Sequence, residues 1–355
     1  MERPLQRIKI RTKILALVLA VCLFSVLSMS ITALIAEKRI ANYSQSALIG
    51  QAQDYLEIIA HKQSASGNGI LESITFNVGL IEGVVRDIFN HQDVYASTHP
   101  VIKRFELKED EYGEIEYQST YTLSKNIPFT EEIRHELDLL SNLSLLLPMH
   151  TGNTDIVGLY VGMESGLSYS YTNISDGETE SEYDPRERPW YISATQKPDR
   201  VIFTEVYEDA FGRGRVLTAA KAIFLGDDSS GELLGVAGVD ILLDDFRRLI
   251  SDTSITASGY AFIIDKEGND IVHPDMEHTD NKHTDNEKSV LAKTALCADK
   301  NLAEGYRLMM NGEYGWVEGE IDGKKVFLTF SSISAADWSL GVIIFKDELL
   351  FRRSY

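Results

Sequence analysis

The sequence predicts an α+β protein with an N-terminal transmembrane helix, a long helical spine and two successive antiparallel sheets. The first observation is an apolar run near the N-terminus, followed by a helical pattern of apolar residues that continues to about residue 96. The second is a change, after residue 100, to short alternating segments separated by turns, which is typical of strands. Because these strands form two groups along the chain, the pattern indicates two successive sheets.

Length and composition limit the classes of function. The chain has 355 residues, of which 44% are hydrophobic and 25% charged, so it is long enough for two folded domains. Its formal net charge of −20 argues against nucleic acid as a partner, because phosphate binding requires clustered lysine and arginine. The two cysteines, Cys22 and Cys297, provide neither a disulfide framework nor a cysteine-rich metal site.

The first element is an apolar run from Ile14 to Ala36 that contains no charged residue. As a helix it would span roughly 35 Å, enough to cross a hydrocarbon core of about 30 Å. The basic residues before it are Arg3, Arg7, Lys9, Arg11 and Lys13, against the single acid Glu2. This excess predicts a single-pass protein of the cell (inner or plasma) membrane, with its N-terminus in the cytoplasm and the residues after the run outside. The alternative is a cleaved signal peptide, but the run is longer than a usual signal core and ends without an A-x-A site.

A helical pattern from Glu37 to about Ala96 forms the predicted spine. Its apolar residues recur on one stripe, namely Ile40, Leu48, Ile49, Tyr55, Leu56, Ile58 and Ile59, then Ile74, Val78, Ile81, Val84, Val85 and Ile88. Gly67-Asn68-Gly69 is a candidate interruption. The stripe has two interpretations, which are burial within the same chain and a homodimer contact between paired helices.

Alternating segments bounded by Gly-containing turns predict the strands. The first group is Asp155–Met163, Leu167–Asn173, Arg200–Val206, Val216–Phe224 and Leu233–Ile241, before a short helix over Asp244–Ser251. The second group is Gly259–Asp265, Asp270–His273, Gly315–Ile321, Lys325–Ser331 and Trp338–Phe345. The predicted organisation is a cytoplasmic N-terminus at 1–13, a transmembrane helix at 14–36, a long helix at 37–96, modules at 97–250 and 251–350, and a tail at 351–355.

One segment concentrates groups that bind small polar ligands. It contains Tyr183, Arg188, Trp190 and Tyr191, with Tyr207, Asp209 and Asp240 further along the chain. A guanidinium favours a carboxylate, and the indole and phenol groups add donors, whereas the downstream acids favour an ammonium. Because a free α-amino acid carries both charged groups on one carbon, this set predicts a ligand of that class.

Four motifs connect these observations to a known family. They are Asp184-x-Arg186-x-Arg188-Pro189-Trp190-Tyr191, Gly235-Val-Ala-Gly-Val-Asp240-Ile241, Gly259-Tyr-Ala-Phe-Ile-Ile-Asp265 running to His273-Pro274, and Trp338-Ser-Leu-Gly-Val342. With them, residues 37 to 350 resemble the extracytoplasmic double Cache (dCache) domain of bacterial chemoreceptors, sensor kinases and diguanylate cyclases. The resemblance implies two PAS-like modules stacked along one long helix, with the ligand in the membrane-distal module.

The chain resembles the amino-acid-binding subset of that family more closely still. The implied carboxylate contacts are Arg188, Trp190 and Tyr191, the implied ammonium contacts are Tyr183, Asp209 and Asp240, and Tyr207 is an additional contact. The resemblance also implies a sensor of a free L-amino acid that signals by helix displacement, without enzymatic activity and without a cofactor. Neither the particular amino acid nor the output partner follows from the sequence, and no output module is recognised before Tyr355.

Other interpretations remain open. Arg188 is also placed to form a structural ion pair with Asp184, Glu187 or Asp209. A sensor of an amine or another small molecule would keep the same fold, although the amine-binding relatives lack the arginine. A membrane-anchored hydrolase would use Asp209 and Asp240 as an acidic site, but no catalytic motif accompanies them.

Two further features are assigned to structure. Arg186 is expected to bond backbone carbonyls, because the amino-acid pattern does not require it. His273, His278 and His283 lie near acidic residues, but their spacing of five matches no common zinc pattern, so no metal site is predicted.

Overall fold

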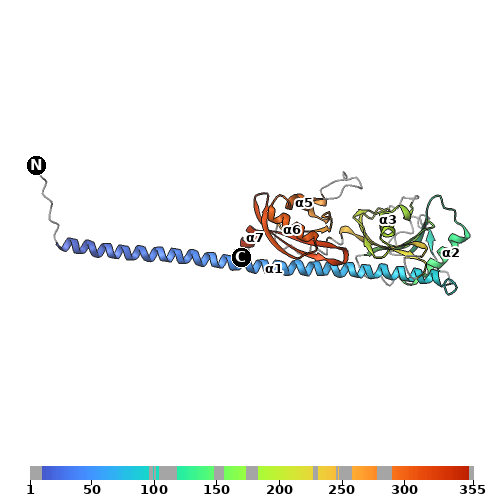
Figure 1. Ribbon diagram of the computed structural model, residues 1–355, viewed down its shortest axis with the longest axis horizontal. Coiled ribbons are helices and arrows are strands. Elements are labelled where there is room, and N and C mark those ends of the chain that lie inside the picture. The colour runs from blue at the N-terminus through green and yellow to red at the C-terminus, as the bar shows by residue number, and fades with distance from the viewer. Residues whose placement is uncertain are drawn as a thin grey trace, which may run out of the picture. The chain divides into compact units, whose positions relative to one another are not determined.

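One long helix and two antiparallel sheets account for the fold. In the computed structural model of the protein, the described residues are 10–95, 99, 101–103, 118–147, 156–172, 183–226, 231–244, 247, 258–277 and 290–351. Helix α1 (Ile10–Asn90) runs without a break (Figure 1). The α+β class predicted from the sequence is confirmed, together with the two modules.

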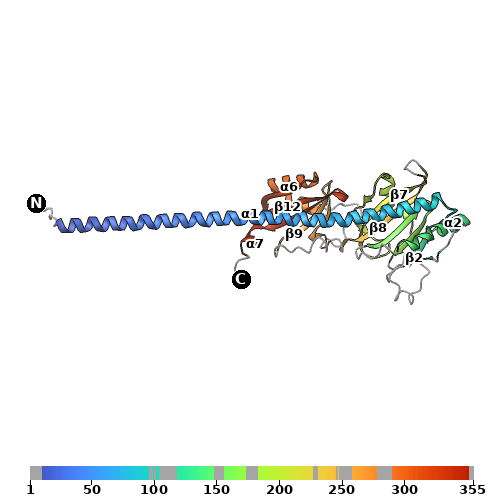
Figure 2. The same cartoon turned by 90° about the horizontal axis from the view of Figure 1, so that it is seen from below.

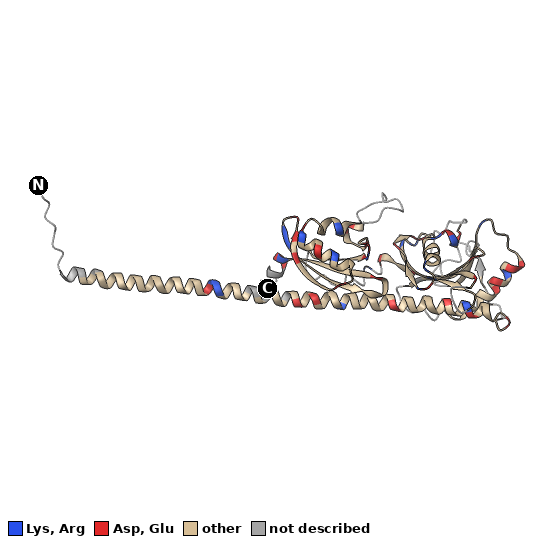
Figure 3. Cartoon of the chain, viewed as in Figure 1, with Lys and Arg blue, Asp and Glu red and all other residues tan. Residues whose placement is uncertain are grey.

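The first part of α1 has the composition of a membrane span. An 18-residue window in it has a mean hydropathy of 2.5, and none of that window is buried in the structure. Figure 3 shows almost no charged residues along this part of the helix. By length and composition, α1 is therefore able to cross a membrane. Residues 1–9, which hold the basic positions up to Lys9, lie outside the described residues.

The first module is built on an eight-stranded sheet. Its strands are β1 (Ile102–Lys103), β2 (Gln118–Leu123), β3 (Ile156–Met163), β4 (Leu167–Thr172), β5 (Ile202–Phe203), β6 (Tyr207–Glu208), β7 (Arg215–Phe224) and β8 (Leu233–Leu242). The order is β1-β2-β4-β3-β8-β7-β5, and β6 pairs with β7. All pairs are antiparallel except β1 with β2. Helices α2 (Glu131–Leu140) and α3 (Pro189–Gln196) and the 3-10 turns η3 (Ser141–Leu145) and η5 (Pro185–Glu187) complete this module.

The second module is a five-stranded antiparallel sheet. Its strands are β9 (Tyr260–Asp265), β10 (Asp270–Val272), β11 (Gly315–Ile321), β12 (Lys324–Ile333) and β13 (Trp338–Phe345), in the order β10-β9-β13-β12-β11. Its helical elements are η6 (Pro274–Glu277), α5 (Leu291–Leu296), α6 (Lys300–Met310), η7 (Ser334–Ala336) and α7 (Lys346–Phe351). Apolar residues of α5, α6 and four of the strands form its core.

From Glu57 onward, α1 lies against both sheets (Figure 2). Its buried apolar side chains are Leu71, Ile74, Val78, Ile81, Val85 and Ile88, so burial within the chain accounts for this part of the stripe. Ser64 hydrogen-bonds Ser331 of the second module, and Lys221 of the first module pairs with Glu82. Each module is thus attached to a different stretch of the helix.

Three local expectations need correction or fall outside the described residues. The helix is not interrupted at Gly67-Asn68-Gly69, because Asn68 there accepts hydrogen bonds from Ala335 N (2.8 Å) and Ser334 Oγ of the second module, which hold the segment in place. The strand expected over Arg200–Val206 is reduced to β5, which pairs with only two residues in the middle of β7, Ala219 and Ala220. Most of the helix expected over Asp244–Ser251, and the module boundaries at 97 and 250, lie outside the described residues.

Candidate functional site

A short turn and a helix start position the arginine and tryptophan of the motif. Asp184 precedes η5, and its side chain accepts a hydrogen bond from Arg186 N at 3.0 Å. The Arg186 guanidinium bonds the same carboxylate and the backbone carbonyl of Glu164, so Arg186 is the fold residue that the sequence predicts. Pro189 then starts α3, which suits the fixed φ of proline at a first helical position.

The Arg188 guanidinium makes few contacts with the described residues. Its Nη2 donates to the backbone carbonyl of Glu208 at 3.2 Å, and its guanidinium lies 5.6 Å from the centre of the Tyr207 ring. Within the described part of the chain it forms no ion pair, because Asp184 pairs with Arg186 and Asp209 pairs with Arg213. The guanidinium is therefore available to a ligand carboxylate, which argues against a structural ion pair for this residue.

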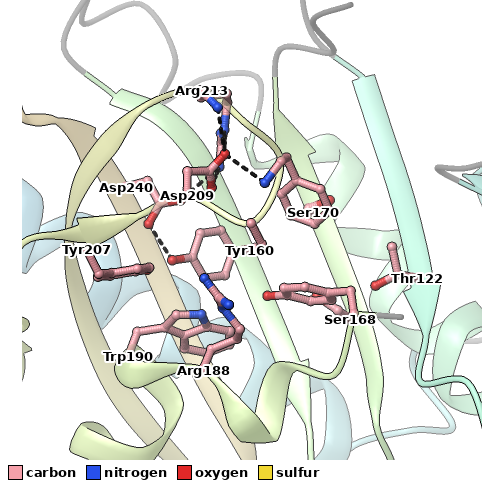
Figure 4. A pocket seen from close by; sticks show the side chains of 13 residues that line it. Thr122, Tyr160, Ser168, Ser170, Arg188, Trp190, Tyr207, Asp209, Arg213 and Asp240 are labelled. Carbon is pink, nitrogen blue, oxygen red and sulfur yellow. Dashed lines mark hydrogen bonds and ion pairs between the residues drawn. The ribbon is translucent and has the colours of Figure 1, made fainter. Parts of the chain in front are cut away.

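Asp240 is the buried acceptor of the site. It lies on β8, and its Oδ1 accepts hydrogen bonds from Thr218 Oγ1 on β7 at 2.6 Å and from the Tyr160 hydroxyl on β3 (Figure 4). Thr218 stands directly opposite Asp240 in the β7–β8 register. Gly238 makes room for Tyr160, since a Cβ there would lie 2.2 Å from Cε2 of the ring.

Asp209 lies in the turn between β6 and β7 and is bound by that same turn. Its Oδ2 accepts from the backbone N–H groups of Phe211 and Arg213 and from Arg213 Nε at 2.8 Å. Arg213 Nη2 donates to Asp209 Oδ1 at 2.8 Å and to Asp240 Oδ2 at 3.0 Å. One buried guanidinium therefore connects the two acids, and the sequence did not identify it (Figure 4).

Aromatic residues and hydroxyl groups form the remaining walls. Tyr183 packs against Phe211, with ring centres 5.0 Å apart, and Trp190 packs edge-on against Tyr160 at 4.9 Å. Opposite these rings, β2 and β4 contribute Thr122, Ser168 and Ser170. Thr122 Oγ1 is buried and has no hydrogen-bond partner among the described atoms.

The structure gathers six of the seven predicted residues around one cavity. They are Tyr183, Arg188, Trp190, Tyr207, Asp209 and Asp240. Tyr191 does not line the cavity. It packs against Trp190, and its hydroxyl donates to Glu164 Oε2 at 2.8 Å. The cavity has a volume of about 20 Å³, which holds a single water but not an amino acid.

The two acids of the site differ in electrostatics. Burial raises the pKa of Asp240, although the Arg213 charge opposes this effect. Burial also pushes the pKa of Asp209 upward, but the hydrogen bonds and charge of Arg213 outweigh it and lower that pKa. The two carboxylates in turn raise the pKa of Arg213 despite its burial, so it is a permanent cation. Among the described residues no group of histidines, cysteines and acids has the arrangement of a metal site.

Comparison with known proteins establishes the family. The family model dCache_1, a Cache domain, matches residues 118–352, and the chain belongs to this family. The chain is 29% identical over 193 residues to the methyl-accepting chemotaxis protein PctB of Pseudomonas aeruginosa, covering 53% of this chain and 26% of that protein. It is 26% identical over 200 residues to the methyl-accepting chemotaxis protein McpC of Bacillus subtilis, covering 56% of this chain and 26% of that protein.

A solved structure shares the fold. The ligand-binding domain of the P. aeruginosa PAO1 amino acid chemoreceptor PctB, in complex with L-Arg, matches with a TM-score of 0.50 and 21% identity, covering 84% of this chain and 97% of that chain. The chain spans about a quarter of the length of the two curated relatives. Both curated relatives are named as methyl-accepting chemotaxis proteins, and the chain shares the Cache domain family of sensor domains with the solved chemoreceptor structure.

Proposed function

We propose that this protein is a membrane-anchored sensor that binds a free L-amino acid in the cavity of its first module. The observation that carries the proposal is that the Arg188 guanidinium, which forms no ion pair among the described residues, lines the same cavity as the buried carboxylate of Asp240. A zwitterion with a carboxylate and an ammonium on one carbon can pair with both groups. The name of the P. aeruginosa domain, an amino acid chemoreceptor in complex with L-Arg, supports the same ligand class.

Each side chain has a role in this proposal. Arg188 and the indole N–H of Trp190 would bind the ligand carboxylate, while Asp240 and Tyr183 would bind its ammonium. Asp209 would contribute negative charge at the ammonium end, with Tyr207 as a wall. Tyr191 was assigned to the carboxylate from the sequence, and in the ligand-free structure its hydroxyl is bonded to Glu164 instead. It would join the site only if that bond breaks.

Topology and output belong to the same proposal. The apolar start of α1 would anchor the chain once in the cell membrane, with its N-terminus in the cytoplasm and the two modules outside. Because α1 is continuous from that anchor to the first module, we propose that ligand binding displaces this helix within a homodimer. The family of the chain and the chemotaxis receptors among its relatives support a role in signal transduction.

A binding screen on the full chain in detergent micelles tests the proposal. At a ligand concentration of 100 times the dissociation constant, at least one of the twenty L-amino acids should add about 2.7 kcal/mol of stability, seen as a raised melting temperature. The methyl ester of the same amino acid, which lacks the carboxylate, and its 2-hydroxy acid, which lacks the ammonium, should each bind far more weakly. Mass spectrometry should recover the amino acid unchanged. If no L-amino acid raises the melting temperature at millimolar concentration, the proposal is wrong.

Substitution of Arg188 provides the matching test on the protein. Arg188→Ala should lower the affinity for the amino acid at least a hundredfold, or about 3 kcal/mol, because a charged donor pair is lost. Arg188→Lys keeps the charge but not the planar arrangement of donors, so its affinity should lie between those of the wild type and Arg188→Ala. Arg215→Ala, which removes an arginine of the same module that does not line the cavity, is the control. Wild-type affinity in Arg188→Ala, measured by calorimetry, would assign the carboxylate to another group.

A further inference from the structure

The ammonium end of the proposed site is already occupied by a side chain of the protein. Asp240 Oδ1 accepts hydrogen bonds from Tyr160 and Thr218. Among the described residues, Oδ2 accepts a hydrogen bond from Arg213 alone. The guanidinium is almost fully buried, with 8% of its side chain exposed, and the cavity beside it holds no more than one water. A ligand ammonium therefore has neither room nor a free acceptor until Arg213 moves.

Two glycines determine the conformation of the turn that carries Arg213. Arg213 stands between Gly212 and Gly214, whose φ angles of 74° and 104° lie in the left-handed region that favours glycine. A Cβ at either glycine would meet no atom within 4 Å, so tight packing does not explain these residues. Two backbone hydrogen bonds, Asp209 N to Gly214 O and Gly212 N to Asp209 O, close the turn on itself. The turn can therefore shift as one unit.

Of the two acids that it contacts, Arg213 makes more hydrogen bonds with Asp209 than with Asp240. Two parallel hydrogen bonds of 2.8 Å join its guanidinium to Asp209 within the turn, whereas a single bond of 3.0 Å joins it to Asp240 on the sheet. Leaving a buried charge without a partner is costly. If the turn moves outward, Arg213 keeps Asp209 as its partner, and an incoming ammonium replaces it at Asp240. Every charge then remains paired.

We propose that Arg213 is an internal cation that occupies the ammonium subsite of Asp240, and that an amino acid binds by exchanging its ammonium for this guanidinium. This inference rests on the proposed function of the cavity. It adds that the Arg213 guanidinium competes with the ligand ammonium for Asp240. It also changes the role of Asp209, whose carboxylate holds Arg213 rather than the ligand. The affinity for amino acids is then set partly by the cost of moving this turn.

The test compares Arg213→Gln with Arg215→Gln, a control that removes a neighbouring arginine outside the cavity. Each variant, as the full chain in micelles, is titrated by calorimetry with each of the twenty L-amino acids. An amino acid that binds the wild type should bind Arg213→Gln at least tenfold more tightly, equivalent to about 1.4 kcal/mol, and Arg215→Gln as it binds the wild type. Methylguanidinium, which copies the displaced group, should compete with the amino acid in Arg213→Gln and not in the wild type.

The possible results separate this proposal from the proposed function. Binding to Arg213→Gln alone supports Arg213 as a competitor at Asp240, but it overturns amino-acid sensing by the wild type. Equal or weaker binding to Arg213→Gln than to the wild type overturns the exchange and leaves the proposed function standing. Binding to neither protein overturns both. If Arg213→Gln does not fold, Arg213→Lys keeps a cation but cannot bridge two carboxylates through a planar fork, and it should still bind more tightly than the wild type. Unchanged affinity in that variant also overturns the exchange.

Discussion

At the scale of single residues, the surroundings of a carboxylate determine the direction in which its pKa shifts. Asp209 and Asp240 contact the same guanidinium, yet the pKa of Asp209 is lowered and that of Asp240 is raised. The difference arises because Asp209 accepts two backbone N–H groups and a bidentate pair, whereas Asp240 is enclosed by the sheet and has one charged donor. Asp240 is therefore the acid that gains more from an added cation.

His273 in the second module is a residue whose burial should make stability depend on pH. Its side chain is 3% exposed, its Nε2 is buried without a hydrogen-bond partner among the described atoms, and its ring packs against Tyr260. Burial lowers the pKa of His273, while Asp270 and Asp275 oppose this and Arg247 adds to it. The folded state consequently binds the proton less readily than the unfolded state, whose histidine titrates near pH 6.5.

The sign of the effect follows from proton linkage. The unfolded state binds more protons, so the free energy of unfolding should decrease as the pH falls through about 6.5 toward the lower pKa of the folded state. We expect the wild type to lose stability between pH 7.5 and pH 5.5 in urea unfolding followed by tryptophan fluorescence. His273→Leu should lose less over the same range, and His61→Gln, at an exposed histidine, should behave as the wild type. Equal losses in the wild type and His273→Leu would contradict this assignment.

At the scale of elements, strand β7 connects the candidate site with helix α1. Thr218 on one face of the strand donates to Asp240, and Lys221, three residues on, is on the other face. The Lys221 ammonium lies 3.1 Å from Glu82 Oε2 of α1, and the same carboxylate also pairs with Arg86 at 3.0 Å. A shift of β7 at the site would therefore be transmitted to a buried acid on the helix.

Glu82→Gln tests how much this connection stabilises the module. The Glu82 side chain is 6% exposed, so losing its charge leaves two partly buried cations without their acceptor. We expect a loss of about 1–3 kcal/mol in the free energy of unfolding. The matched control is Glu304→Gln, whose pair with Arg307 is more than half exposed on both sides and should change stability by less than about 0.5 kcal/mol. If urea titrations give the two variants the same small effect, β7 is not firmly attached to α1 through this pair.

The same elements show which features a sequence reveals. Most strands were predicted because short, largely apolar segments stand between turn residues, and β7 and β13 are buried along nearly their whole length. Residues on those strands, such as Asp240, could therefore be assigned to the site. Arg213 was missed because its contacts depend on a turn held by Gly212 and Gly214, and no periodicity reports the direction of a turn side chain. Tyr160 was missed because only the strand register, which pairs it with Gly238, brings its hydroxyl within reach of Asp240 two residues further on.

At the scale of the whole molecule, the outward face of α1 is the feature that the fold of one chain does not explain. Ile58 and Phe76 are separated by 18 residues, five full turns at 3.6 residues per turn, so they share one face of the helix. Both side chains are more than 60% exposed. Exposed apolar side chains repeated along one face indicate a partner surface. We therefore propose that this stripe is the contact of a homodimer.

Cross-linking in membranes tests this dimer and its response to a ligand. The background carries Cys22→Ser and Cys297→Ser, since both native cysteines are exposed. Ile58→Cys places a thiol on the stripe, and we expect paired chains to form a disulfide there, at a rate that changes when the amino acid found in the screen is added. The physical reason is that helix shifts of about 1–2 Å, which are within the known repertoire of switching proteins, alter the distance between two facing thiols.

Tyr314→Cys is the control for chance collisions, because that side chain is 73% exposed and directly precedes β11 of the second module. A disulfide through Ile58→Cys that forms no faster than one through Tyr314→Cys would rule out the stripe as the dimer contact. A disulfide that forms rapidly but at the same rate with and without the amino acid would leave the dimer standing and remove helix displacement as its signal. Only a ligand that prefers one arrangement of the paired helices can change that rate. The experiment therefore measures the coupling between the cavity and the membrane anchor.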